Sequence, residues 1–162
     1  MLALTLIRPW SDALACGPKP IENRSWPPPR SALGQVIAFH GGKKWDEDAA
    51  LDMRLPMERG VPALWPECPR LAIGSAEGVV GAGRLMGYVT PGGSIVCMDG
   101  GRERAVERTL YDGGRWYTGA YGWIFGHRRA LHAPVLCRGA QGLWRLPDEV
   151  ERLVREQLGG AT

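Results

Sequence analysis

Two cations, a carboxylate and an indole stand within eight residues of each other, at Lys19, Glu22, Arg24 and Trp26. Lys19 would neutralise a phosphate or act as a desolvated base, and the planar guanidinium of Arg24 would hold a phosphate or a base edge. Glu22 would accept a hydrogen bond from a base or a ribose hydroxyl, and the indole of Trp26 would stack on a base. These residue types predict a site for a nucleotide or a nucleic acid.

The backbone of this segment is expected to be extended, because Pro20 disfavours a helix through it. Side chains alternate between the two faces of an extended strand, so Glu22 and Arg24 share one face and Lys19 points to the other unless Pro20 redirects it. In the alternative interpretation, Glu22 and Arg24 form a buried ion pair, Lys19 lies in solvent and Trp26 covers the edge of the core.

A second set of candidate ligand contacts follows two apolar runs. His40 and Lys43 flank the glycines at 41–42, which would let backbone N–H groups approach a phosphate; a hairpin-like turn with surface lysines is the alternative. Tyr121 would donate its hydroxyl to a phosphate or base. Trp123 would stack on a base, or else fill the core.

Two basic segments, His127–Arg129 and Arg102–Arg108, are either solvated faces or borders that guide a polyanion toward the site. The net charge is mildly basic, since 20 Lys and Arg against 17 Asp and Glu give +3. Such a sum permits a nucleic-acid partner without requiring one, because an electrostatic footprint needs clustering.

Several other kinds of site are excluded by spacing. The three histidines have no partner at metal-ligand spacing, so neither a metal nor a cofactor is expected. The run Gly78–Gly83 lacks the Lys-Ser/Thr of a phosphate-binding loop. No apolar run approaches the length of a membrane span. The cysteines form no CxxC pair and are predicted to be free thiols in a reducing cytoplasm; they are Cys16, Cys68, Cys97 and Cys137.

The elements that would hold these residues are short, as 23 glycines and 13 prolines predict. Pro9, Asp46 and Pro147 mark helix starts, and Gly17 and Gly159 follow helix ends. Apolar and β-branched runs predict the strands. The predicted strands are residues 2–7, 33–40, one or two within 71–90, a short run at 95–98, 121–131 and 139–146.

This order indicates an α+β fold or a small β-barrel of five to seven strands with flanking helices, in one domain over residues 1–162. The helices stand at the start, middle and end of the chain, which is not the alternation of a βαβ fold. Residues 102–108 are expected to be a solvated loop or a short helix, and the structure of 91–115 is otherwise left open.

Four motifs, in this order and spacing, resemble the ASCH domain family, which has a PUA-like β-barrel fold. The similarity covers about residues 4 to 146, followed by a C-terminal helix at about 147–158. The hallmark is a G-x-K-x-x-E-x-R run after the first helix. The four stretches are Leu4–Trp10, Gly17–Trp26, Phe39–Asp46 and Tyr121 to Trp144.

The resemblance implies an RNA-associated or nucleic-acid-associated module that binds RNA, a nucleotide or a nucleoside in a cleft. Some members are enzymes, which makes a hydrolase the alternative: an amidohydrolase of N4-acylcytidines or a ribonuclease, with Lys19, Glu22 and Tyr121 as catalytic residues. In the amidohydrolases a Thr nucleophile stands three residues after the Lys. Here that position is Glu22, and a carboxylate cannot be activated by proton removal as a hydroxyl can.

Overall fold

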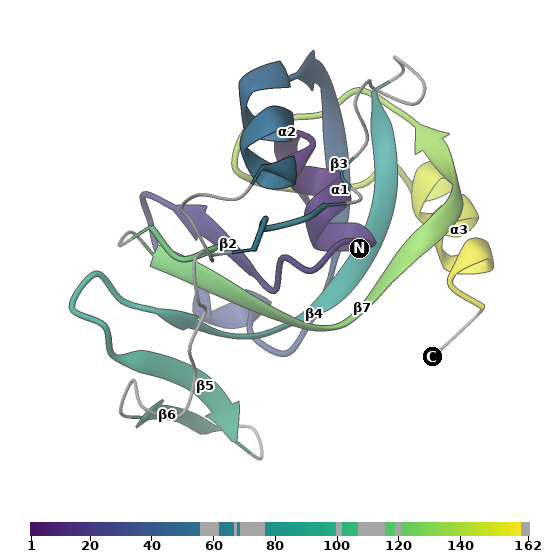
Figure 1. Cartoon of the computed structure of the whole chain (residues 1–162). Coiled ribbons are helices and arrows are strands. Elements are labelled where there is room, and N and C mark those ends of the chain that lie inside the picture. Colours follow the sequence, from purple (N-terminus) through teal and green to yellow (C-terminus); the bar gives the residue numbers. More distant parts are fainter. Residues whose placement is uncertain are drawn as a thin grey trace. The chain divides into compact units, whose positions relative to one another are not determined.

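The computed structural model describes residues 1–55, 62–66, 68, 77–99, 102–106, 116–118 and 121–159. It has an α+β fold, in which a mixed β-sheet is combined with three α-helices and one short 3-10 helix (Figure 1). The strands are β1 (Leu2–Arg8), β2 (Ile21–Arg24), β3 (Val36–Trp45), β4 (Gly78–Val89), β5 (Ile95–Asp99), β6 (Arg102–Val106), β7 (Tyr121–Leu136) and β8 (Leu143–Arg145). The helices are α1 (Trp10–Ala15), η1 (Arg30–Ala32), α2 (Glu47–Arg54) and α3 (Asp148–Gln157).

Hydrogen-bonded neighbours in the sheet follow the order β2-β7-β4-β3-β1-β8, with β5 paired to β4 and β6 paired to β5. β1 is parallel to β3 and antiparallel to β8, so the sheet is mixed. Within the described part of the chain β2 and β8 end this order and do not pair with each other. The sheet is therefore open there, and closure into a PUA-like barrel stays a prediction.

Backbone contacts divide the chain into two compact units. The first unit contains Met1–Pro18, Ile37–Ala82 and Arg128–Thr162. The second contains Lys19–Val36 and Gly83–His127. Since β4 and β7 are the long strands, of 12 and 16 residues, each contributes residues to both units.

The helices of the first unit begin and end where the sequence predicts. The side chain of Asp46 caps α2 by accepting a hydrogen bond from the amide of Ala49 at 3.0 Å. α3 follows Pro147 and turns its apolar stripe onto a core built from β1, β3, β4 and β7. The stripe consists of Val150, Leu153, Val154 and Leu158.

Two predicted elements are wrong. Arg102–Val106 forms strand β6 instead of a loop or short helix, and it pairs with β5 from Asp99↔Arg102 to Ile95↔Val106. With β6, the residues that the structure describes contain eight strands, against the expected five to seven. The turn expected at residues 41–42 is also absent, because β3 continues through both glycines to Trp45. The predicted strand region 71–90 contains β4, and residues 71–76 lie outside the described residues.

Candidate functional site: a charged and aromatic face of the β2–β7 ladder

The antiparallel pairing of β2 with β7 places four predicted site residues on one face of the second unit. Glu22 lies opposite Trp123 and Arg24 lies opposite Tyr121. Directly opposed residues in an antiparallel pair share a face, and so do residues two apart on one strand. The prediction that Glu22 and Arg24 share a face is thus confirmed, and the register adds the two aromatic residues of β7 to them.

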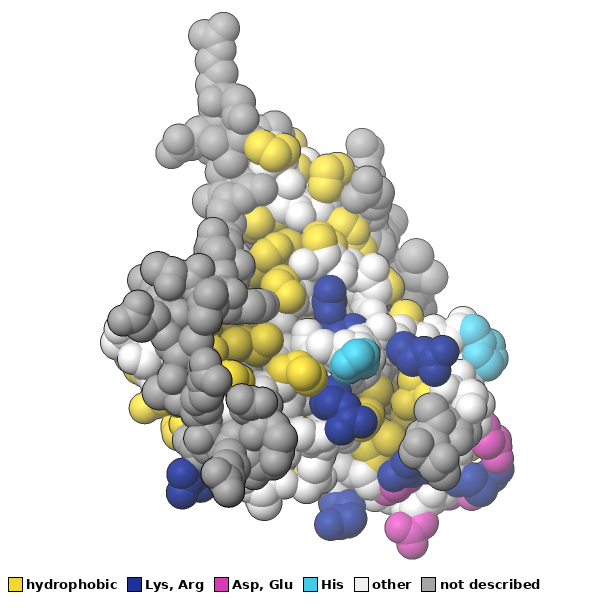
Figure 2. All heavy atoms as spheres, turned by 90° about the horizontal axis from the view of Figure 1, so that it is seen from below, with side chains coloured by type: hydrophobic (Ala, Val, Ile, Leu, Met, Phe, Trp, Pro, Cys, Tyr) yellow, Lys and Arg dark blue, Asp and Glu magenta, His cyan; other side chains and the backbone are white. Residues whose placement is uncertain are grey.

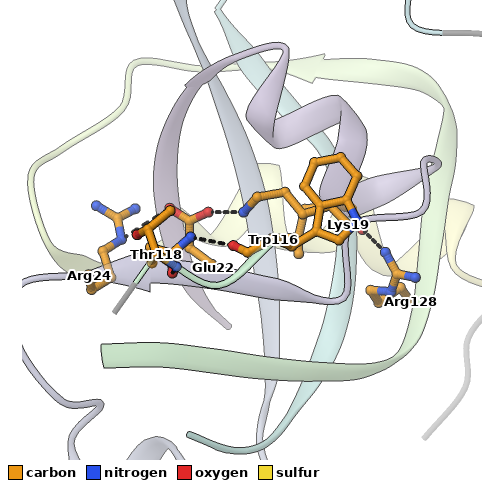
Figure 3. A network of polar contacts seen from close by, with 8 residues as sticks. Lys19, Glu22, Arg24, Trp116, Thr118 and Arg128 are labelled. Atoms are coloured by element: carbon orange, nitrogen blue, oxygen red, sulfur yellow. Dashed lines mark hydrogen bonds and ion pairs between the residues drawn. The ribbon is translucent and has the colours of Figure 1, made fainter. Parts of the chain in front are cut away.

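The other face of the ladder is a small apolar core that anchors the site. Ile21 and Ile124 are buried there against Val89 and Ile95. The side chain of Asn23 also points to this face: its amide donates to the carbonyl of Trp116 at 2.7 Å, and its oxygen accepts from the amide of Thr118 at 3.1 Å (Figure 3). These long-range hydrogen bonds fix the short strand β2 to the segment that contains Trp116 and Thr118.

Lys19 lies with Glu22 and not in solvent. Its side chain is only 2% exposed, and its ammonium donates to the Glu22 carboxylate (Figure 3). The other oxygen of that carboxylate lies 3.5 Å from the Arg24 Nε. The carbonyl of Pro20 accepts a hydrogen bond from the amide of Phe125, which ties the chain between Lys19 and β2 to β7. The interpretation that Lys19 lies in solvent is therefore wrong, and the Lys19 ammonium reaches the carboxylate of Glu22, as expected for a chain redirected near Pro20.

The exposure of the three side chains increases from Lys19 through Glu22 to Arg24. Lys19 and Glu22 are nearly buried, with 2% and 11% of their side chains exposed, whereas Arg24 is 21% exposed. Two cations share one carboxylate, so these three groups together carry one net positive charge. A ligand approaching from solvent would meet Arg24 first.

Trp26 and Trp123 meet edge to face, with ring centroids 4.7 Å apart and planes at 88°. The indole N–H of Trp123 donates to the carbonyl of Trp26 at 3.1 Å, which ties the segment after β2 to β7. Trp123 is 0% exposed, so it packs against Trp26 and has no ring face on which a base could stack. Trp26 is half-buried and keeps part of its surface in solvent.

Tyr121 is half-buried at the start of β7, and its ring lies 6.3 Å from that of Tyr88, tilted by 52°. Sequence reasoning missed Tyr88, which follows a glycine-rich run and carries no motif of its own. Strand alternation contained a usable signal: the next residue, Val89, packs in the core of the opposite face, so Tyr88 points to the site face.

His40 and Lys43 belong to the first unit. The imidazole of His40 is 0% exposed: Nε2 donates to the carbonyl of Cys137 at 3.1 Å, and the ring meets that of Trp144 edge to face. Lys43 is exposed on β3. The glycines at 41–42 lie within strand β3, with Leu6↔Gly41 in register, so the alternative of a hairpin-like turn is wrong and the phosphate cradle stays a prediction. The proximity of these residues to Lys19 stays a prediction.

Two arginines of the predicted basic tip bind helix ends. In the first unit, Arg128 donates to the carbonyl of Leu14, in the last turn of α1, at 3.0 Å and to the carbonyl of Gly17, which follows the helix, at 3.2 Å. Arg129 donates to the carbonyl of Leu158 after α3 at 2.8 Å. Cations stabilise such carbonyls, so both arginines have a structural role.

Positive charge is scattered on the molecular face seen in Figure 2. The Lys and Arg side chains lie there separately, among hydrophobic and other groups, over the part of the surface that the structure describes. The side chains of the other predicted basic segment, at 102–108, lie outside that part.

Thiol and metal chemistry find no support in the described residues. The four cysteines are free, and burial raises the pKa of the Cys16, Cys68 and Cys137 thiols, which disfavours thiolate nucleophiles. No group of His, Cys, Asp and Glu with metal-binding geometry occurs in that part of the chain. None of its helices is long and apolar enough to span a membrane.

The chain matches no protein-family model and no curated protein.

Proposed function

We propose that the chain is an RNA- or nucleotide-binding module that uses the charged and aromatic face of the β2–β7 ladder. One observation carries the proposal: the register brings Glu22, Arg24, Tyr121 and Trp123 to the same face, and Lys19 joins them through its ion pair. A guanidinium next to half-exposed aromatic rings can hold a phosphate while a base stacks beside it.

The burial of each group assigns its role. Arg24 and Trp26 are the direct contacts, to phosphate and to base, because both retain exposed surface. Lys19 is a positioning residue that holds Glu22, since its ammonium is committed to that carboxylate and nearly buried. Glu22 in turn orients Arg24, and Tyr121 lies opposite Arg24 with its hydroxyl as a further donor.

The ASCH resemblance agrees with this assignment, since its G-x-K-x-x-E-x-R run falls on Gly17 to Arg24. We propose accordingly that the open sheet belongs to a PUA-like barrel and that the protein works in the cytoplasm, where its four free thiols would persist.

The arginine contact is tested by Arg24→Gln, which removes the guanidinium and keeps a polar side chain of similar reach. Fluorescence anisotropy with a fluorescein-labelled octauridylate at low salt should show binding to the native chain and a loss of about tenfold in the variant. Arg145→Gln is the matched control, because it removes the same charge from an exposed arginine of β8 in the first unit. If the two substitutions weaken binding equally, the effect of Arg24→Gln comes from the change in overall charge, and the assignment of Arg24 as a direct phosphate contact is wrong.

A hydrolase remains the second candidate because the ammonium of Lys19 donates directly to a carboxylate in a nearly buried place. Such a pair can relay a proton: once Glu22 takes a proton from the ammonium, the neutral amine of Lys19 is the base that accepts a proton from the substrate, and Tyr121 is the donor to the leaving group. Incubation with N4-acetylcytidine and with labelled RNA tests it. Turnover that is lost in Glu22→Gln, a variant that keeps the shape of the side chain, would favour the enzyme; absence of turnover with both substrates would remove it.

A further inference from the structure

We propose that the site takes two consecutive, unstacked nucleotides of a single strand, with Tyr88 and Tyr121 forming a second aromatic platform beside Trp26. This rests on the proposed nucleotide-binding function and specifies its ligand as a strand instead of a mononucleotide. The argument starts from the spacing of aromatic groups along β7.

Two half-exposed aromatic places lie along the same face. The first is Trp26, whose ring is held 4.7 Å from that of Trp123. The second is the Tyr88–Tyr121 pair, with ring centroids 6.3 Å apart. Trp123, against which the ring of Trp26 packs, and Tyr121 are two residues apart on β7, so the residues that anchor the two places are offset by about 7 Å along the strand.

This separation selects the conformation of the ligand. Bases stacked in a helix follow each other at about 3.4 Å, roughly half of that separation. A strand that occupies both places must therefore splay neighbouring bases apart, as single-stranded RNA does on the aromatic faces of β-sheets. A duplex, whose bases remain stacked and paired, does not fit two platforms with this spacing.

Arg24 stands where the linking phosphate of such a dinucleotide would lie. It is directly opposite Tyr121 in the β2–β7 register and two residues before Trp26 in the chain. Its Nε lies 3.5 Å from a carboxylate oxygen of Glu22, and Glu22 lies opposite Trp123, so the side chain of Arg24 extends from the level of Tyr121 toward that of Trp123. In this proposal one base stacks on Trp26, the linking phosphate contacts Arg24, and the next base stacks on the Tyr88–Tyr121 pair.

Competition against a fluorescein-labelled octauridylate tests the proposal, with UMP and the dinucleotide pUpU as unlabelled competitors. Each stacked base contributes about 1–3 kcal/mol, so pUpU should bind about 5- to 150-fold more tightly than UMP. Tyr88→Leu should weaken pUpU by a similar factor and leave UMP unchanged, whereas Trp26→Leu should weaken both. Tyr88→Phe keeps the ring and should bind pUpU as the native chain does, which separates stacking from loss of folding.

The two proposals fail in different ways. If the native chain does not bind octauridylate, the proposed function is wrong and the two-base site falls with it. If it binds octauridylate but UMP and pUpU compete equally, or Tyr88→Leu weakens both alike, the function stands and the second platform is refuted. Equal competition by a 20-base-pair RNA duplex would likewise overturn the requirement for splayed bases.

Discussion

Replacing Lys19 by methionine should destabilise the fold more than it directly affects ligand contact, because the ammonium serves a buried carboxylate. Removing one partner of a buried ion pair costs about 3–5 kcal/mol, since the remaining charge stays desolvated. Glu22 is 11% exposed and retains Arg24 at 3.5 Å, which places the expected loss at the low end, about 3 kcal/mol. Methionine keeps the length of the apolar stem, so little of this loss comes from packing.

The measurement is urea unfolding followed by tryptophan fluorescence and circular dichroism. With an m-value of about 2 kcal/mol/M, a loss of about 3 kcal/mol lowers the midpoint by about 1.5 M. Glu22→Gln should cost a similar amount, because it leaves the ammonium of Lys19 without its carboxylate in a site that is 2% exposed. The double variant, Lys19→Met with Glu22→Gln, should lie within about 1 kcal/mol of the native chain, because both charges are gone.

The double-mutant cycle decides whether the reasoning holds. A coupled buried pair gives a double variant that is more stable than either single variant, with a coupling energy of at least about 2 kcal/mol. If the two losses simply add, or if Lys19→Met alone costs less than about 1 kcal/mol, Lys19 is not the buried partner of Glu22. Its role as a positioning residue would then be wrong, and direct phosphate binding by Lys19 would return as the better explanation.

Three further expectations concern the first unit. Gly139→Ala should cost about 1–3 kcal/mol in urea unfolding, because the added Cβ would meet the buried imidazole at 2.5 Å, whereas Gly92→Ala, with only one side-chain atom at 3.8 Å, should be close to neutral. Arg128→Met should cost about 1.5–3 kcal/mol by leaving two carbonyls at the end of α1 without this donor, and Arg145→Met, at an exposed place, should change stability by less than about 0.5 kcal/mol. Burial raises the pKa of the Cys68 thiol in the folded state, so the native state holds this proton more tightly and stability should fall as the pH rises above about 8.5. Urea unfolding at pH 7 and pH 10 should show this decline, and it should be smaller in Cys68→Ala; an equal decline in both would assign it to other groups.

Local patterns predicted most of the secondary structure and half of the site. Asp46 three residues before Ala49 is a capping signal that acts within one turn, and α2 begins directly after it. The pairing of Glu22 with Arg24 followed from the two-residue period of a strand, which depends on no distant contact. The helical stripe before Gly159 likewise needed only the helical period.

The remaining features depend on contacts between distant parts of the chain, which no local pattern contains. The ammonium of Lys19 donates to Glu22, and the residue between Lys19 and β2, Pro20, is held by a hydrogen bond from the amide of Phe125, more than 100 residues later. His40 is buried because Gly139 leaves room for its ring, and an alanine there would touch the imidazole.

The site itself shows the same dependence, and this explains its composition. β2 has four residues and contributes only Glu22 and Arg24 to the face; the register with β7 supplies Tyr121 and Trp123 from about 100 positions away. A strand this short cannot hold two charged side chains in place through its own ladder alone. The fixed orientation of Arg24 therefore depends on the apolar core beneath Ile21 and on the Glu22 carboxylate beside it. Substitutions in that core should alter ligand affinity through the angle of the guanidinium, even where no ligand atom is touched.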